Sequence, residues 1–164
     1  MKKLIMIILL LIVSSKLSAN ISYEIDTVTY AQCIEHIKHN ESFKSNVYIS
    51  LNNKYIGYGH LIKKNEHYVK ISEYQATEIL KKDLNGCLKV MFDNTKLKSN
   101  KLLALGLLSY NLGVGKVLNY IKTHDISNKY EKTLNYCKYK VNGNVKHSEK
   151  LKQRRLFEYN LWVK

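Results

Sequence analysis

Hydrophobic residues recur with a helical period over most of the chain, beginning with residues 29–40, TYAQCIEHIKHN. Four apolar positions fall on one helical face of this segment: Tyr30, Cys33, Ile34 and Ile37. Thr29, followed three residues later by Gln32, has the form of a capping box. The pattern therefore predicts a first helix that begins at Thr29.

Four further helices follow from the same kind of pattern. Residues 71–92 predict a long helix, because Ser72 and Gln75 repeat the capping box and Ile71 is placed to pack on the first turn. Residues 100–115, NKLLALGLLSYNLGVG, are apolar on almost every side, which is typical of a helix buried at the centre of a domain. The last two helices are predicted over residues 128–139 and 148–162.

The period changes to two between the first two helices, in residues 47–59, VYISLNNKYIGYG. The Asn52-Asn53 pair suits a two-residue turn, because Asn tolerates positive φ. Pairing outward from that turn places Leu51 opposite Lys54, Ser50 opposite Tyr55 and Ile49 opposite Ile56. One small antiparallel hairpin among helices predicts an α+β fold.

The first 19 residues have the anatomy of a secretory signal peptide. Two lysines precede an apolar run from Leu4 to Val13, and the small residues Ser18 and Ala19 follow. Ten apolar residues are too few to span a bilayer, although an uncleaved membrane anchor is the alternative. We therefore predict a signal peptide over residues 1–19, a single domain over residues 20–164, and a secreted or periplasmic protein.

The chain is strongly basic, with 27 Lys and Arg against 13 Asp and Glu, a formal charge of +14. Removing residues 1–19 takes away three lysines and no acid, which leaves 24 basic against 13 acidic residues and a charge of +11. Such a charge favours nucleic acid, acidic lipid or a cell-wall polymer, and export makes nucleic acid the poorest of the three. A codon bias that inflates Lys, Asn, Ile and Tyr is the alternative explanation.

Three cysteines, Cys33, Cys87 and Cys137, are widely spaced and lack the spacing of metal ligands. Each lies in an apolar helical context, so burial in the core is the favoured interpretation. One disulfide with a remaining thiol is the alternative after export. No metal site and no cofactor are indicated.

One carboxylate, Glu41, stands alone between the first predicted helix and the hairpin. A carboxyl group just past the end of a helix faces the negative end of the helix dipole, which disfavours ionisation, and cover by the hairpin would disfavour it further. A general acid in glycoside cleavage must hold its proton near neutral pH. A solvated surface acid is the simpler alternative.

Residues 40–60, NESFKSNVYISLNNKYIGYGH, resemble the catalytic signature of phage-type lysozymes, glycoside hydrolase family 24. In that family a Glu-Gly pair is followed by a Tyr seven residues after the Glu, an Asp or Cys two residues beyond, a Gly-containing turn and Thr-Ile-Gly-Tyr-Gly-His. Later segments resemble the family's helices: ISEYQATEILKKDL, ALGLLSYNLGVG and LKQRRLFEYNLW. The resemblance runs from Thr29 to Trp162 and implies a lysozyme-like fold, with a hairpin lobe and a helical lobe joined by a long helix.

The resemblance assigns Glu41 as the proton donor and Gly57-Tyr58-Gly59-His60 as the motif that closes the hairpin. The residues expected to bind substrate or to support the site are Tyr48, Tyr58, His60, Asn111, Arg154 and Arg155. The two arginines fall where the family places a basic residue that pairs with the catalytic Glu, although a solvated helix face is the alternative. His60 is expected to be a framework residue rather than a participant in proton transfer, and Asn111 fits a structural or a functional role equally.

Four positions depart from the family pattern. Ser50 occupies the position of the second acid, and Tyr55 occupies that of the Thr. The turn is one residue shorter and lacks Gly, and Ser42 replaces the Gly after the catalytic Glu. Because Ser50 cannot ionise, we expect Ser50 and Tyr55 to hold a water without deprotonating it, which lowers activity.

The resemblance thus implies a monomeric muramidase (lysozyme) that acts on peptidoglycan, with no cofactor, no nucleic-acid partner and no stable membrane insertion once the signal is removed. The first alternative is a peptidoglycan-binding protein of an envelope or secretion system that keeps the glycan groove but has lost turnover. A basic membrane-active protein is a poorer alternative.

Overall fold

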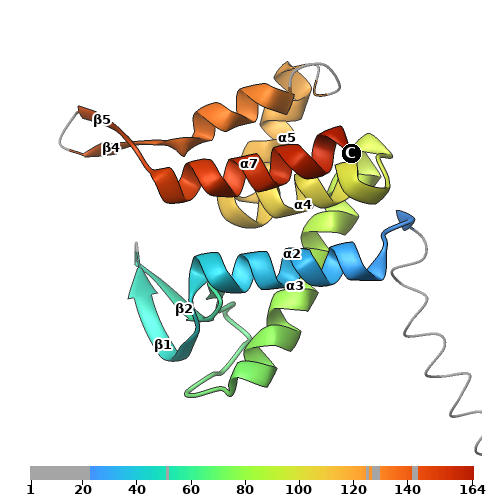
Figure 1. Ribbon diagram of the computed structural model, residues 1–164. Coiled ribbons are helices and arrows are strands. Elements are labelled where there is room, and N and C mark those ends of the chain that lie inside the picture. Colours follow the sequence, from blue (N-terminus) through green and yellow to red (C-terminus); the bar gives the residue numbers. More distant parts are fainter. Residues whose placement is uncertain (1–22, 51, 125, 127–129, 142–143) are drawn as a thin grey trace, which may run out of the picture.

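The computed structural model describes residues 23–50, 52–124, 126, 130–141 and 144–164, and the predicted signal peptide lies outside them. Within these ranges the elements are α2 (Thr27–Glu41), β1 (Lys44–Ser50), β2 (Asn53–Gly57), β3 (His60–Leu61), α3 (Glu73–Thr95), α4 (Ser99–Leu112), α5 (Val114–Thr123), the 3-10 helix η2 (Tyr130–Cys137), β4 (Lys138–Val141), β5 (Asn144–His147) and α7 (Glu149–Val163). Figure 1 shows α2 between the β1–β3 sheet with the first turns of α3 on one side and the group α4, α5 and α7 on the other.

The N-terminal caps differ between the first two helices. The cap predicted at Thr29 is wrong, because the Asp26 side chain caps α2 and accepts hydrogen bonds from Thr29 N at 2.7 Å and from Thr29 Oγ1 at 2.8 Å. The predicted capping box of α3 is confirmed: Ser72 Oγ accepts from Gln75 N, and Gln75 Oε1 accepts from Ser72 N. Helix α2 also runs one residue further than expected, so Glu41 is its last residue rather than the first beyond it.

The predicted hairpin forms, but its register is wrong by two positions. Strand β1 ends at Ser50 and β2 begins at Asn53, with Ser50 opposite Asn53 and Tyr48 opposite Tyr55. Asn52 has φ of 63°, so it takes the positive-φ turn position, and Asn53 is the first residue of β2. Ser50 therefore does not face Tyr55, although a shift of two keeps both on the same face of the sheet.

The C-terminal half contains more elements than the sequence pattern predicts. Gly113, at φ 89°, separates α4 from a further helix, α5. Where one helix was predicted over residues 128–139, η2 ends at Cys137 and the β4–β5 hairpin follows. The Ser148 amide donates to the Cys137 carbonyl at 3.0 Å, which holds the base of this hairpin to the N-cap of α7. The hairpin extends beyond α7 on the same side of the molecule as β1 (Figure 1).

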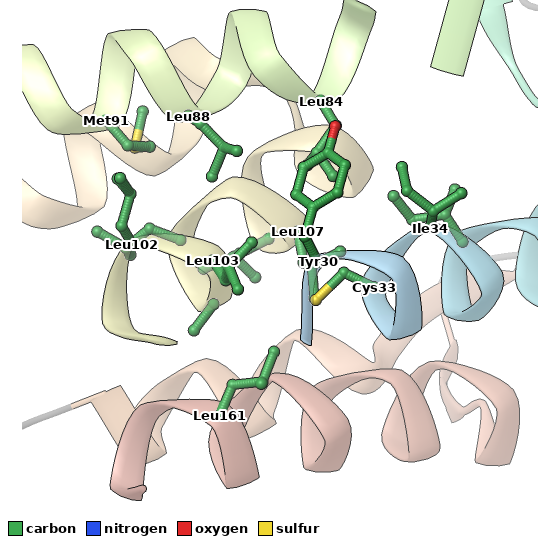
Figure 2. Close-up of a cluster of buried hydrophobic side chains, with 14 of the residues drawn as sticks. Tyr30, Cys33, Ile34, Leu84, Leu88, Met91, Leu102, Leu103, Leu107 and Leu161 are labelled. Atoms are coloured by element: carbon green, nitrogen blue, oxygen red, sulfur yellow. The ribbon is translucent and has the colours of Figure 1, made fainter. Parts of the chain in front are cut away.

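The core is formed where α2, α3, α4 and α7 meet. Figure 2 shows side chains from these helices converging, and the labelled ones are Tyr30, Cys33, Ile34, Leu84, Leu88, Met91, Leu102, Leu103, Leu107 and Leu161. The predicted burial of the cysteines holds for Cys33 and Cys137, whereas Cys87 is partly exposed, and no disulfide joins the three. Among the described helices, none combines the length and hydrophobicity needed to cross a membrane.

Candidate active site

Glu41 lies at the junction between the β1–β3 sheet and the helices. Its Oε1 accepts a hydrogen bond from Arg154 Nη2 at 2.8 Å, which links the end of α2 to α7. The Glu41 side chain is 27% exposed and that of Arg154 is 9% exposed. Glu41 is thus anchored on one side yet reachable from solvent, and Arg154 does not lie on a solvated helix face.

The turn between β2 and β3 passes next to the second oxygen of Glu41. A Cβ added at Gly59, where φ is 89°, would lie 3.8 Å from Glu41 Oε2. Gly57, at φ 66°, allows the same turn to pack on α3, since a Cβ there would lie 3.1 Å from that of Ala76. The glycines of the Gly-Tyr-Gly-His motif therefore let the backbone approach both α3 and the Glu41 carboxyl group.

Two tyrosines fix this turn in place. The Tyr110 hydroxyl, on α4, donates to the Tyr58 carbonyl at 2.6 Å, and the Tyr58 hydroxyl donates to Glu73 Oε1 at 2.7 Å. The Tyr58 side chain is buried, and burial also raises the pKa of Tyr110 well above its usual range, which keeps its hydroxyl a donor. Tyr58 therefore supports the turn rather than presenting its ring to a ligand.

Tyr48, Ser50, Asn53 and Tyr55 share the face of the hairpin that lies toward Glu41. The observed register pairs Tyr48 with Tyr55, and their rings stack with centroids 5.7 Å apart. Burial raises the pKa of Tyr48, and the nearby charge of Glu41 raises it further. Ser50 is exposed two residues along the same face, so its hydroxyl is available to a molecule bound against Glu41.

His60 is held between two carboxylates away from Glu41. Its Nδ1 lies 2.7 Å from Asp83 Oδ2, and its Nε2 lies 3.1 Å from Glu66 Oε2. The hydrogen bond with Asp83 raises the pKa of His60, and burial opposes this shift. His60 thus pins β3 to α3. Glu66 and Glu73, the nearest acids after Ser50 in the sequence, are bound to His60 and Tyr58.

Arg155 and Asn111 form a second, deeper cluster with Glu158. Arg155 Nη2 donates to Glu158 Oε1 at 2.7 Å and to Asn111 Oδ1 at 2.9 Å, and the Arg155 and Glu158 side chains are 0% exposed. Burial raises the pKa of Glu158, whereas the positive charge of Arg155 opposes this shift. The adjacent arginines of α7 therefore hold different acids: Arg154 binds Glu41 and Arg155 binds Glu158.

Sequence reasoning missed Asp83 and Glu158 as members of this arrangement. Glu158 follows Arg155 by three residues, so a helical ion pair was visible in the sequence. Its complete burial was not visible, because that depends on α2, α4 and η2 closing over α7. Nothing in the sequence pairs Asp83 with His60, 23 residues earlier.

Comparisons with known proteins agree with this geometry. The model of the phage lysozyme family matches residues 38–158. The muramidase domain of SpmX from Asticaccaulis excentricus is 19% identical, with a TM-score of 0.67 over 81% of this chain and 95% of that chain. The endolysin from Escherichia coli O157:H7 phage FAHEc1 is 26% identical, with a TM-score of 0.61 over 80% of this chain and 90% of that chain.

A third solved structure, a variant of P22 lysozyme, is 20% identical, with a TM-score of 0.59 over 85% of this chain and 98% of that chain. The comparison with curated proteins finds no match. The solved structures confirm the predicted lysozyme-like α+β fold.

Proposed function

The chain belongs to the phage lysozyme family, and from that premise we propose that it is a muramidase. The bond cleaved is the β-1,4 linkage between N-acetylmuramic acid and N-acetylglucosamine in peptidoglycan, and Glu41 is the general acid. The observation that carries this proposal is the setting of Glu41 between Arg154 and the Gly59 turn, with its side chain 27% exposed. Two solved relatives, a muramidase domain and an endolysin, support the same reaction class.

The proposed chemistry assigns separate work to the two oxygens of Glu41. Oε1 is occupied by Arg154, so the proton for the leaving group is carried on Oε2, beside Gly59. As the bond between the sugar carbon and the bridging oxygen breaks, that proton passes to the bridging oxygen. A water then attacks the sugar carbon and releases a proton.

The attacking water lacks a carboxylate at the position where the family pattern has one. We assign its positioning to the hydroxyl groups of Ser50 and Tyr55, which share a face of the hairpin in the observed register. A hydroxyl group holds a water but does not take its proton, so turnover is expected to be slower than with Asp at position 50. The stacked Tyr48 and Tyr55 rings offer a flat surface for a sugar ring beside it.

The surroundings proposed for this activity follow from the charge and the N-terminus. A charge of +14 suits the anionic cell wall, and the signal-like residues 1–19 would deliver the protein to it as a monomer outside the cytoplasm.

A digest of purified peptidoglycan tests the proposal. Incubation with the chain from residue 20, followed by borohydride reduction and mass analysis, is expected to yield fragments with newly reduced N-acetylmuramic acid ends. Fragments cut in the peptide stems would contradict it. Pelleting of the protein with the wall without any new reducing end would instead favour the binding protein that has lost turnover.

A further inference from the structure

A small cavity lies behind Glu41, on the side away from solvent. It has room for about one water molecule. The residues that line it come from α2, α4 and α7: His36, Ile37, Glu41, Leu107, Tyr110, Asn111, Arg154 and Glu158. Most of these side chains are polar, so the cavity differs from the apolar voids that stay dry.

Glu158 supplies the reason for a ligand in this cavity. Its Oε1 accepts from Arg155, but its Oε2 has no hydrogen-bond partner among the described residues, although the side chain is 0% exposed. An unpaired buried carboxylate oxygen costs about 1–3 kcal/mol or more. A donor inside the cavity removes that cost.

We propose that the cavity holds one ordered water molecule, which donates a hydrogen bond to Glu158 Oε2 and links Glu158 to the Glu41–Arg154 pair. Polar side chains around the cavity offer the two to four partners that a buried water requires. Glu158 then acts as a positioning residue: through the water it holds the Glu41–Arg154 pair from behind.

This inference rests on the proposed function and gives it a more specific geometry. Arg154 already binds Glu41 Oε1, and a second hydrogen from the water satisfies that same side of the carboxyl group. Oε2, beside Gly59, is then the oxygen without an internal donor. The acidic proton is thereby directed to the oxygen that faces the hairpin.

The water itself is tested by a high-resolution crystal structure of the chain from residue 20. We expect density for one water within hydrogen-bond distance of Glu158 Oε2. A cavity without density, or a water that bonds other groups but not Glu158, would overturn the proposal. This measurement does not depend on catalysis, so it is separable from the failure of the muramidase activity.

The positioning role is tested by filling the cavity. Leu107 lines it, and Leu107→Phe displaces the water without removing any charged or hydrogen-bonding group. Leu103 lies on the same helix and in the same core cluster (Figure 2) but does not line the cavity, so Leu103→Phe is a matched control for overpacking.

We expect Leu107→Phe to lower kcat by about 10- to 100-fold with little change in KM, because misplacing a reacting group slows chemistry without weakening binding. Leu103→Phe is expected to lower stability to a similar degree and to keep kcat. Equal losses of kcat in the two variants, at temperatures where both are folded, would show that the cavity has no positioning role. If Leu107→Phe does not fold, the crystallographic result alone decides.

Discussion

Glu41 owes its position to three separate segments of the chain. Helix α2 ends at this residue, α7 provides Arg154, and the β2–β3 turn provides the close approach of Gly59. The residue after it, Ser42, has φ of 60°, a conformation that glycine adopts more readily and that explains why the family pattern has Gly there. At this scale the site is complete on the side of the acid and altered on the side of the water.

Restoring the second acid tests that view. Ser50→Asp is expected to raise kcat by about 10²-fold, because a carboxylate can take the proton that a hydroxyl group cannot. Ile49→Asp is the control: Ile49 is 72% exposed on the opposite face of the same strand, so its carboxylate faces away from Glu41. Lysis rates of purified walls measure both, and equal rates for Ser50→Asp and the unaltered chain would show that a missing base does not limit turnover.

Residue roles were predictable from sequence only where neighbours along the chain or a family pattern defined them. Ser72 and Gln75 form a local cap, and the residues alone specified it. The contact between Glu41 and Arg154 spans 113 positions, so it came from the family resemblance. Asp26 was overlooked as the cap of α2, because Thr29 and Gln32 offered a competing capping pattern three residues later.

At the scale of elements, α3 and α4 cross at Gly106. A Cβ at this position would lie 2.4 Å from Leu88 Cδ2 and 3.2 Å from Leu88 Cγ, and Leu88 is 0% exposed. The glycine therefore sets how closely the two helices pack, and the core residues of both helices depend on that spacing.

Alanine substitutions measure this crossing. Gly106→Ala is expected to lower the free energy of unfolding by about 1–3 kcal/mol, the usual cost of overpacking a core. Gly86→Ala on α3, where a Cβ meets no atom within 4 Å, is expected to raise it by about 0.5–1 kcal/mol through helix propensity. Urea denaturation checks both, and a neutral or stabilising Gly106→Ala would contradict the close crossing.

The existence of the β1–β2 hairpin was predictable, but its register was not. Alternation of side chains identifies which residues share a face, and a shift of two residues leaves every face unchanged. The turn decides the register, and both Asn52 and Asn53 are suited to positive φ; the structure gives that role to Asn52. The β4–β5 hairpin and η2 were missed because the preceding pattern was taken as one helix.

At the scale of the whole molecule, His60 ties the sheet to the long helix that joins the two parts. It bonds Asp83 on α3 and Glu66 in the loop after β3, and the Asp83 hydrogen bond raises the pKa of His60. A raised pKa in the folded state means that the stabilisation is fully present below the unfolded value of about 6.5 and is lost as pH rises through the folded value.

His60→Asn tests this link through the pH dependence of stability. At about pH 5 the variant is expected to unfold with about 1.5–3 kcal/mol less free energy than the unaltered chain, the range of charge-assisted hydrogen bonds. The difference is expected to shrink as pH rises above about 7. His36, whose pKa burial lowers to about 4, gives both proteins a loss of stability in acid, and this background cancels in the difference. A difference that stays constant with pH would mean that His60 is neutral throughout.

The account as a whole depends on Glu41 as the proton donor, and the rate at which new reducing ends form from purified peptidoglycan tests it most directly. Glu41→Gln keeps an oxygen for Arg154 but has no acidic proton, so the rate is expected to fall by about 10²–10⁴-fold with the fold intact. Glu149→Gln, an exposed acid at the start of α7, is expected to keep the full rate. Equal rates for Glu41→Gln and the unaltered chain would contradict the proposed mechanism.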